Sequence, residues 1–389
     1  MKSAEETIEY WLEPELYEAL WRSVDGRIAR KIAELGKALE EVAALRNVVN
    51  VKQIDAAAPP VFDVYAIDSS YTSPPLELVG GVLAVLAYGY FGVSGGVQDK
   101  YLTGRLYFED SDERNISRVA AVEERRLAAR LLWKKHRGEK KLDLLILDGE
   151  IAVHPLPFNL AVEHKEINEV VGKMLRNASV TRTSVVAVTK RVRSRHLSVL
   201  AGKCLKMNDK AAASAILRPG EYFVLGRLRD ILPKWAPIYY AECRGGEEKD
   251  AILRCHEGGG AARLSPRGAL LCKRLGEFYG NFEKVLSHPT LKLLGDVVIA
   301  YYLPPGLKTA VRVEVLDFGE LGIEKIISYL MLTTSTATGY PLILDTVDRY
   351  VKAPQELADA MYMAITSKTP DRLTHLMWST NMQKQLRRY

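Results

Sequence analysis

The chain has 389 residues, enough for one large domain or two of ordinary size. Its 54 Lys and Arg residues against 48 Asp and Glu residues give a net charge of +6, which permits a nucleic-acid partner without requiring one. The sequence contains no uninterrupted apolar run of the roughly eighteen residues that a membrane span needs. The acidic N-terminal residues lack the basic-then-apolar order of a signal peptide, so we expect a cytoplasmic protein.

Residues 3–47 are predicted to be helical. Apolar residues repeat there at alternating steps of four and three, which defines a heptad-like seam: Ile28, Ile32, Leu35, Leu39, Val42 and Leu45. Either the seam packs on its own domain, or it contacts a second copy of the chain or another partner. The stretch Asp55–Pro60 reads as a linker, so we treat residues 1–58 as an assembly segment.

The next elements follow a distinctive order. An apolar strand leads into Asp68, and strand-like runs at 77–91 and 100–108 precede a long helix at 112–136. A further buried strand at 142–147 then ends in Asp148. Three strands, a helix and a fourth strand are the opening of an RNase H-like fold. We therefore predict an α/β protein with an RNase H-like core, its mixed central sheet flanked by helices.

The later part of the chain alternates strands and helices. Strands are expected at 185–188, 297–302 and 309–313, and helices at 265–286 and 320–332. The main domain is predicted to span 59–367, with a C-terminal helix or tail at 368–389. The four cysteines lie too far apart for a Cys-x-x-Cys zinc site, and we expect reduced, mostly structural thiols: Cys204, Cys243, Cys255 and Cys272.

Two aspartates follow apolar strands in the same way. If the strands that end in Asp68 and Asp148 are neighbours, both carboxylates converge at one edge of the sheet. Two carboxylates at such a distance repel each other unless a divalent cation lies between them. Mg²⁺ and Mn²⁺ prefer such oxygen ligands. Taken singly, each aspartate is more commonly a turn or helix cap, and the functional reading depends on the combination of the acids.

The helix between the two aspartates offers a third acid. Glu124 is followed at helical spacing by apolar residues, which places it on the buried stripe, whereas Glu123 is followed by arginines and is expected nearer to solvent. We prefer Glu124 and keep Glu123 as the fallback. Carboxylates that hold metal ions at a sheet edge suit phosphodiester hydrolysis.

The densest basic stretch comes directly after the strand at 185–188. Its side chains suit contact with phosphates, and the predicted DNA-binding residues are Lys190, Arg191, Arg193 and Arg195. The alternative is an ordinary solvated loop.

Several short segments together resemble the NurA nucleases of archaea, which act with the HerA ATPase in processing DNA ends. These segments are YAIDSSY (65–71), LLILDGE (144–150), VVAVTKR (185–191), YYLPPGLKTAVRVEV (301–315) and TGYPLILDTVDRYVK (338–352). Each is short, but the five occur in the order found in the family and extend over most of the chain.

The resemblance implies roles for individual residues. Asp68, Glu124 and Asp148 match metal ligands, and Tyr340 matches the active-site tyrosine of the Gly-Tyr-Pro motif. Eight residues after that tyrosine the family usually has histidine, but this chain has Asp348. By its spacing from Tyr340 we expect Asp348 to face the metal site.

The resemblance also implies an assembly and an activity. It predicts a homodimer that encloses a channel for DNA and docks on a HerA-type hexameric ATPase. It further predicts a 5′-to-3′ exonuclease and single-strand endonuclease that depends on Mn²⁺ or Mg²⁺ and acts in DNA end resection for double-strand break repair. Two alternatives remain: a non-catalytic DNA-clamping or ATPase-docking subunit, and another RNase H-like enzyme that acts on RNA.

Overall fold

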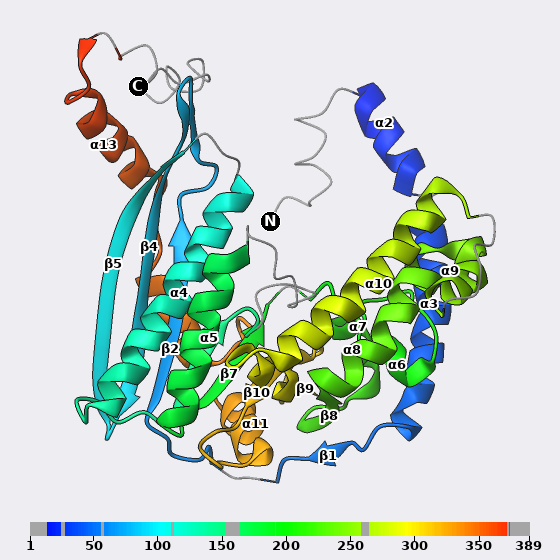
Figure 1. Ribbon diagram of the computed structural model, residues 1–389. Helices are drawn as coiled ribbons and strands as arrows, with labels where there is room; N and C mark the ends of the chain where they lie inside the picture. The colour runs from blue at the N-terminus through cyan, green and yellow to red at the C-terminus, as the bar shows by residue number, and fades with distance from the viewer. Residues whose placement is uncertain are drawn as a thin grey trace.

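The structure is a computed structural model that describes residues 14–24, 28–55, 58–109, 113–151, 164–190, 192–257, 264–371 and 373. A mixed sheet of ten strands forms its centre, and helices cover both faces (Figure 1). The strands are β1 (Lys52–Gln53), β2 (Val64–Tyr71), β3 (Leu76–Leu78), β4 (Gly81–Ser94), β5 (Val97–Glu109), β6 (Leu144–Asp148), β7 (Ser184–Thr189), β8 (Glu221–Arg227), β9 (Val298–Tyr302) and β10 (Val311–Leu316).

The order of the strands confirms the predicted RNase H-like core. β5, β4 and β2 form an antiparallel meander, and β6 lies parallel to both β2 and β7. The sheet then continues through the antiparallel strands β10, β9, β8 and β1. The central parallel strands are buried on both faces, which explains why their sequences are continuous apolar runs rather than alternating ones.

Helices divide between the two faces of the sheet. The helical elements are α2 (Pro14–Ser23), α3 (Ala29–Ala43), α4 (Glu113–His136), α5 (Lys165–Val180), α6 (Ser198–Ala201), α7 (Asp209–Ile216), α8 (Leu228–Pro237), the π-helix η4 (Ile238–Arg244), α9 (Lys249–His256), α10 (Pro266–Ser287), α11 (Ile323–Leu332), α12 (Leu342–Tyr350) and α13 (Gln355–Thr366). The face that carries Tyr65 and Ile67 packs against α4 and α5, and the face that carries Val64 and Ala66 packs against α11 and α12. None of the described helices is long and apolar enough to cross a membrane.

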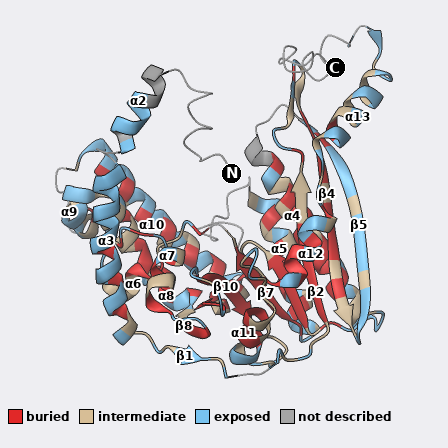
Figure 2. Cartoon of the chain, turned by 180° about the vertical axis from the view of Figure 1, so that it is seen from behind, coloured by how far each residue is buried: buried red, intermediate tan, exposed pale blue. Residues whose placement is uncertain are grey.

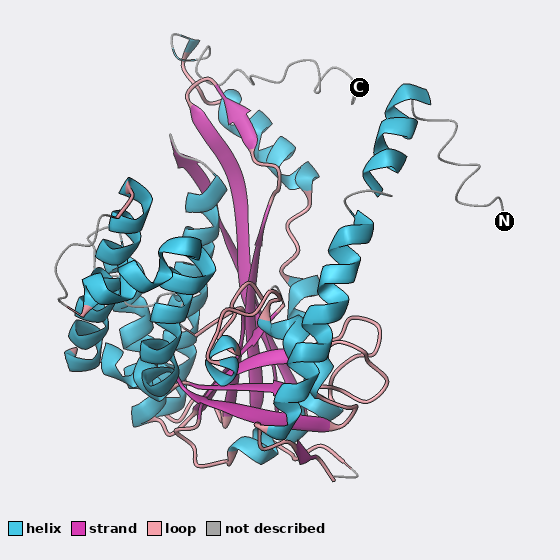
Figure 3. Ribbon diagram, turned by 90° about the vertical axis from the view of Figure 1, so that its right-hand side faces the viewer, coloured by secondary structure: helices cyan, strands magenta, loops and turns pink. Residues whose placement is uncertain are grey.

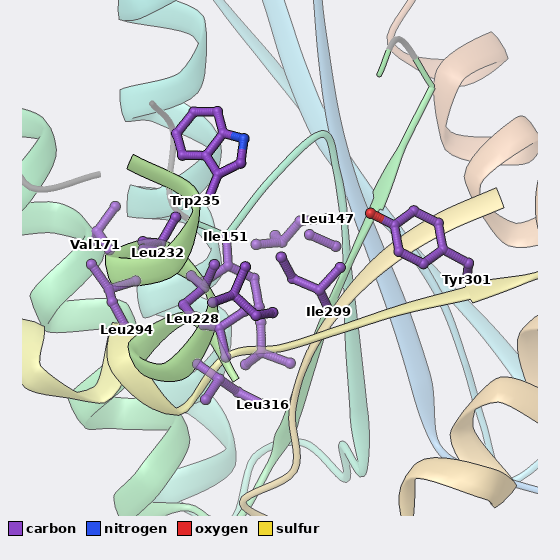
Figure 4. Packing of buried hydrophobic residues seen from close by; sticks show 14 of the residues in the cluster. Leu147, Ile151, Val171, Leu228, Leu232, Trp235, Leu294, Ile299, Tyr301 and Leu316 are labelled. Atoms are coloured by element: carbon purple, nitrogen blue, oxygen red, sulfur yellow. The ribbon is translucent and has the colours of Figure 1, made fainter. Parts of the chain in front are cut away.

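The buried residues follow the sheet from one side of the molecule to the other, and β5 forms an exposed edge (Figure 2). Beyond β7 the first face is covered by α8, whose Leu228, Leu232 and Trp235 belong to the same buried apolar cluster as Ile299 of β9 (Figure 4). Burying one such aliphatic side chain contributes about 1.5–3 kcal/mol. The apolar contacts therefore join the helical region to the same core as the RNase H-like strands.

The N-terminal helices lie beside this helical region (Figures 1 and 3). Val42 and Leu45 of the heptad-like seam are buried, but the earlier seam residues are exposed to solvent: Ile28, Ile32, Leu35 and Leu39. The seam thus packs against the described part of the protein only at its C-terminal end. The other four seam residues are not buried by any described residue.

The cysteines form disulfides, so the prediction of reduced thiols is wrong. Cys204 pairs with Cys243 and Cys255 with Cys272, across 39 and 17 positions of sequence. The tertiary fold brings the segment between α6 and α7 to η4 and brings α9 to α10, with Cα separations of 5.3 and 6.3 Å that lie within the usual range for a disulfide. Sequence spacing cannot reveal such tertiary contacts.

We expect these disulfides to stabilise the helical region by restricting the unfolded chain. Loops of this length correspond to about 3–4 kcal/mol per disulfide in the chain-entropy description. A phosphine reductant should therefore lower the thermal midpoint by several degrees, and so should Cys204→Ser combined with Cys243→Ser. Alkylation of the unreduced protein that labels all four thiols, together with an unchanged midpoint under reductant, would contradict this expectation.

Candidate active site

The parallel register of β2 and β6 brings two aspartates side by side. Ile67 pairs with Leu147, so Asp68 and Asp148 are the next residues on adjacent strands. Strand side chains alternate between faces, and both aspartates share the parity of Ala66 and Ile146, which face α11 and α12. The sheet therefore places both carboxylates on the same face and at the same level.

Asp68 is the more buried of the two, with 3% of its surface exposed. It does not end its strand as expected, because β2 continues along β4 to Tyr71 and only the pairing with β6 ends there. Its Oδ1 accepts from the backbone N–H of Ser69 at 2.7 Å, and its Oδ2 is buried without a hydrogen-bond partner among the described residues. Burial, with the charges of Asp148 and Glu124 added, raises the pKa of Asp68 to about 9.

Lys190 lies between the carboxylates of Asp148 and Asp348. Its Nζ is 2.9 Å from Asp148 Oδ2 and 3.6 Å from Asp348 Oδ1. Burial disfavours the ammonium, but the neighbouring carboxylates, Asp148 foremost, outweigh this effect and raise the pKa of Lys190. Lys190, which was predicted to contact DNA, is thus bound to the acidic site. We call the four acidic residues of this site the acid cluster: Asp68, Glu124, Asp148 and Asp348.

Glu124 approaches the acid cluster from the opposite face of the sheet. It lies on α4, accepts from the hydroxyl of Ser69 and pairs with the guanidinium of Arg125. Burial raises the pKa of Glu124, although Arg125 and the Ser69 hydroxyl oppose the shift. Glu123 is also buried, contrary to expectation.

The contacts of Glu123 distinguish it from its neighbour. It is held by Arg105 at 2.9 Å and by Arg126 at 2.8 Å, so two guanidinium groups share one of its oxygens. Glu124, in contrast, bonds the Ser69 hydroxyl next to Asp68, and the charge of Asp148 contributes to the raised pKa of Glu124. The geometry therefore favours Glu124 over Glu123 as the helical acid of the site.

Tyr340 precedes α12 and faces the same lysine. Its hydroxyl donates to the backbone carbonyl of Lys190 at 3.0 Å, and its ring lies 5.7 Å from Lys190 Nζ and 5.5 Å from Lys210 Nζ. Asp345, in the first turn of α12, accepts from the hydroxyl of Thr338. That bond ties the turn before Tyr340 to α12 and so fixes the tyrosine.

The remaining basic residues after β7 do not form one surface. Arg193 is exposed, whereas Arg195 is half-buried and donates to Cys204 Sγ at 3.6 Å. His196 is buried beside Trp235, and burial lowers its pKa to about 4. Arg191 lies outside the described residues. Of the predicted DNA-binding residues that are described, Arg193 alone presents a solvent-exposed side chain.

A buried arginine connects the two strand ends of the site. Arg312 of β10 donates to Glu150 at 3.1 Å and to Thr189 at 3.1 Å, and it pairs with Glu314 at 2.7 Å. Thr189 in turn donates to the carbonyl of Gly149 at 2.9 Å. These bonds hold the loop after Asp148 against the end of β7.

The donor set is suited to a hard divalent cation at its centre. Asp68 and Asp148 present adjacent carboxyl groups, and the Oδ2 of Asp68 is a buried oxygen without a hydrogen-bond partner among the described residues. In the described part of the chain, however, no group of three or more Asp, Glu, His or Cys side chains is placed to hold a metal ion. Glu124 forms a salt bridge with Arg125, and Asp348 pairs with Lys190, which lies between it and Asp148.

Sequence reasoning missed three polar residues of this site: Ser69, Arg125 and Lys210. Ser69 follows Asp68 in the segment YAIDSSY, and Arg125 follows Glu124. Adjacency to a predicted site residue could therefore have identified both. Lys210 comes from a segment without any motif, and only the tertiary structure brings it to Tyr340.

Comparisons with known proteins indicate the family to which this chain belongs. The family model described as NurA domain matches residues 62–353. The NurA nuclease of Sulfolobus solfataricus is similar at 12% identity and a TM-score of 0.54, over 92% of this chain and 97% of that one. A NurA structure with manganese is 12% identical with a TM-score of 0.47, over 88% of this chain and 98% of the other.

A NurA structure bound to dAMP and manganese is 16% identical with a TM-score of 0.43, over 91% of this chain and 99% of the other. The comparison with curated proteins found no match. The family model covers well over half of the chain, and the Sulfolobus nuclease shares its fold, so this protein belongs to the NurA family.

Proposed function

We propose that this protein is a metal-dependent DNA nuclease, a 5′-to-3′ exonuclease and single-strand endonuclease that acts in DNA end resection. Membership of the NurA family supports the proposal. The observation that carries it is the adjacent pair Asp68 and Asp148, in which a buried carboxylate oxygen lacks a hydrogen-bond partner among the described residues. A purely structural aspartate at 3% exposure would be expected to have both oxygens satisfied.

The acid cluster supplies the ligands for Mn²⁺ or Mg²⁺ in this proposal, with Asp68 and Asp148 at its centre and Glu124 and Asp348 at its sides. When bound, the cation supplies activation of water and neutralisation of charge on the reacting phosphate. Lys190 holds Asp148 and Asp348 in position, and Arg125 does the same for Glu124. Tyr340 orients the backbone that carries Lys190.

Replacing either central aspartate should abolish cleavage. We expect Asp68→Asn and Asp148→Asn to lose cleavage of end-labelled single- and double-stranded DNA in Mn²⁺ or Mg²⁺, while DNA binding in EDTA is retained. Asp296→Asn is a matched control, since Asp296 pairs with Arg227 and Arg229 before the start of β9. Substantial metal-dependent cleavage by either site variant would refute the assignment, and binding without cleavage by the parent protein would favour the clamping alternative.

The same substitution should raise stability in the absence of metal. The folded protein raises the pKa of Asp68 to about 9, so folding disfavours the ionised carboxylate above the ordinary pKa of an aspartate. In EDTA at neutral pH, Asp68→Asn should therefore melt at a higher temperature than the parent. Below about pH 4 the carboxyl is protonated in both folded and unfolded states, and the difference should vanish. Calorimetry at the two pH values checks this, and a lower midpoint for the variant at neutral pH would contradict it.

Asp348 should influence both the rate and the choice of metal. Its carboxylate is a harder ligand than the usual histidine and provides no imidazole to move protons. We expect Asp348→Ala to reduce the cleavage rate at least tenfold, and Asp348→His to remain active with its preference shifted toward Mn²⁺. Rates measured over a series of Mn²⁺ and Mg²⁺ concentrations test this. If Asp348→Ala cleaves like the parent with the same metal preference, Asp348 is not a ligand.

The exposed part of the heptad-like seam suits assembly, and we propose that it contacts the second subunit of a homodimer or a HerA-type hexameric ATPase. Leu35 and Leu39 present apolar side chains with 40% and 49% of their surface exposed. Leu35→Glu combined with Leu39→Glu should lower the oligomeric mass or abolish capture of the ATPase. Lys37→Glu, exposed on the same helix, changes the charge by the same amount and should do neither. Light scattering of both variants measures the oligomeric mass, and normal assembly of the double variant would show that the seam is not an assembly contact.

A further inference from the structure

The first turn of α7 is anchored beside the acid cluster. Asp209 is fully buried, and its carboxylate accepts from the Ser194 hydroxyl at 2.6 Å and from the backbone N–H groups of His196 at 2.9 Å and Leu197 at 2.8 Å. Asn208 caps the helix by accepting from the Ala211 N–H at 2.9 Å. The start of α7 is therefore fixed to the segment that follows Lys190, and its position determines where the next side chain points.

That next side chain is Lys210, which reaches the same Tyr340 hydroxyl that bonds the Lys190 carbonyl. Lys210 Nζ lies 3.4 Å from the Tyr340 hydroxyl and 5.5 Å from the centre of its ring. The hydroxyl donates its proton to the Lys190 carbonyl, so its oxygen is available to the Lys210 ammonium. Tyr340 thus contacts two lysines of the site.

The two lysines differ in how their charge is used. Lys190 is bonded to Asp148 at 2.9 Å and lies 3.6 Å from Asp348, so its charge is matched within the acid cluster. No carboxylate of the described residues lies within salt-bridge distance of Lys210, whose side chain is partly accessible. A cation at the edge of an anionic site, without an anion of its own, is a position for a negatively charged ligand.

We propose that Lys210 binds a non-bridging oxygen of the backbone phosphate that lies over Asp68 and Asp148. This inference rests on the proposed nuclease function and adds a substrate contact that no motif indicates. An ammonium group offers three donors and no acceptor, and it binds phosphate as a point charge without reading the base. The contact should therefore be independent of nucleotide sequence.

The test measures DNA binding separately from cleavage. Affinity for a fluorescent single-stranded oligonucleotide is measured in EDTA at several KCl concentrations. Each lost phosphate contact on single-stranded DNA should lower the slope of log affinity against log salt by about 0.7. Lys210→Gln should show this loss, whereas Lys210→Arg should keep the parent slope. Lys206→Gln, an exposed lysine in the loop before α7, is the matched control and should also keep it.

A neutral phosphate identifies the contact directly. An oligonucleotide with one methylphosphonate at the cleaved linkage should bind the parent several-fold more weakly than the unmodified DNA, and Lys210→Gln should bind both equally. The inference is overturned if Lys210→Gln behaves like Lys206→Gln. It is also overturned if the effect of Lys210→Gln vanishes in a Tyr340→Phe background, because Lys210 would then act only through the tyrosine.

The two proposals fail in distinguishable ways. A parent protein that binds DNA without cleaving it refutes the nuclease proposal, and the salt slopes then still decide the role of Lys210. A parent protein that binds no DNA overturns both. Equal thermal midpoints of the Lys210 and Lys206 variants show that a lost slope does not come from unfolding.

Discussion

Electrostatic repulsion between two carboxylates is the constraint around which this structure is organised. The parallel pairing of β2 with β6 places Asp68 beside Asp148, and burial increases the energetic cost of their charge. The surrounding elements place positive side chains beside the acids: Lys190, directly after β7, pairs with Asp148, and Arg125 of α4 pairs with Glu124. A site that concentrates negative charge in this way is stable only when positive charges balance it, so the two basic side chains are part of its folding energetics.

The sheet determines which groups can reach this point. Alternation of side chains sends Asp68 toward α12 and its neighbour Ser69 toward α4, where the serine hydroxyl bonds Glu124. One dipeptide thus connects both layers of helices to the site. The same alternation directs Arg312 toward the face opposite to α11 and α12, where it bonds Thr189, and Thr189 bonds the loop after Asp148. The strand ends are consequently held in register from both sides of the sheet.

The sequence predicted the features that depend on local pattern and failed on those that depend on tertiary contact. Continuous apolar runs indicated β6 and β7, and the order of strands indicated the RNase H-like core. The sequence places Lys190 in a basic stretch predicted to contact phosphates, but a run of charges does not reveal that its first residue also lies beside Asp148 at the end of a strand. The disulfides and the approach of Lys210 to Tyr340 join segments remote in sequence, and no periodicity encodes such contacts.

In the proposed metal site, Asp348 would alter more than the kind of ligand available to the cation. Its carboxylate lies 3.6 Å from Lys190 Nζ, so the ammonium is shared between Asp148 and Asp348 rather than assigned to Asp148 alone. A neutral imidazole at this position would leave Asp148 as the nearest counterion of Lys190 and would bind the lysine more tightly to it. By drawing on the same ammonium, Asp348 leaves more of the charge of Asp148 available to a divalent cation. The substitution therefore changes the balance among existing charges as well as the donor atom, and the two effects act in the same direction, toward a harder and more anionic site.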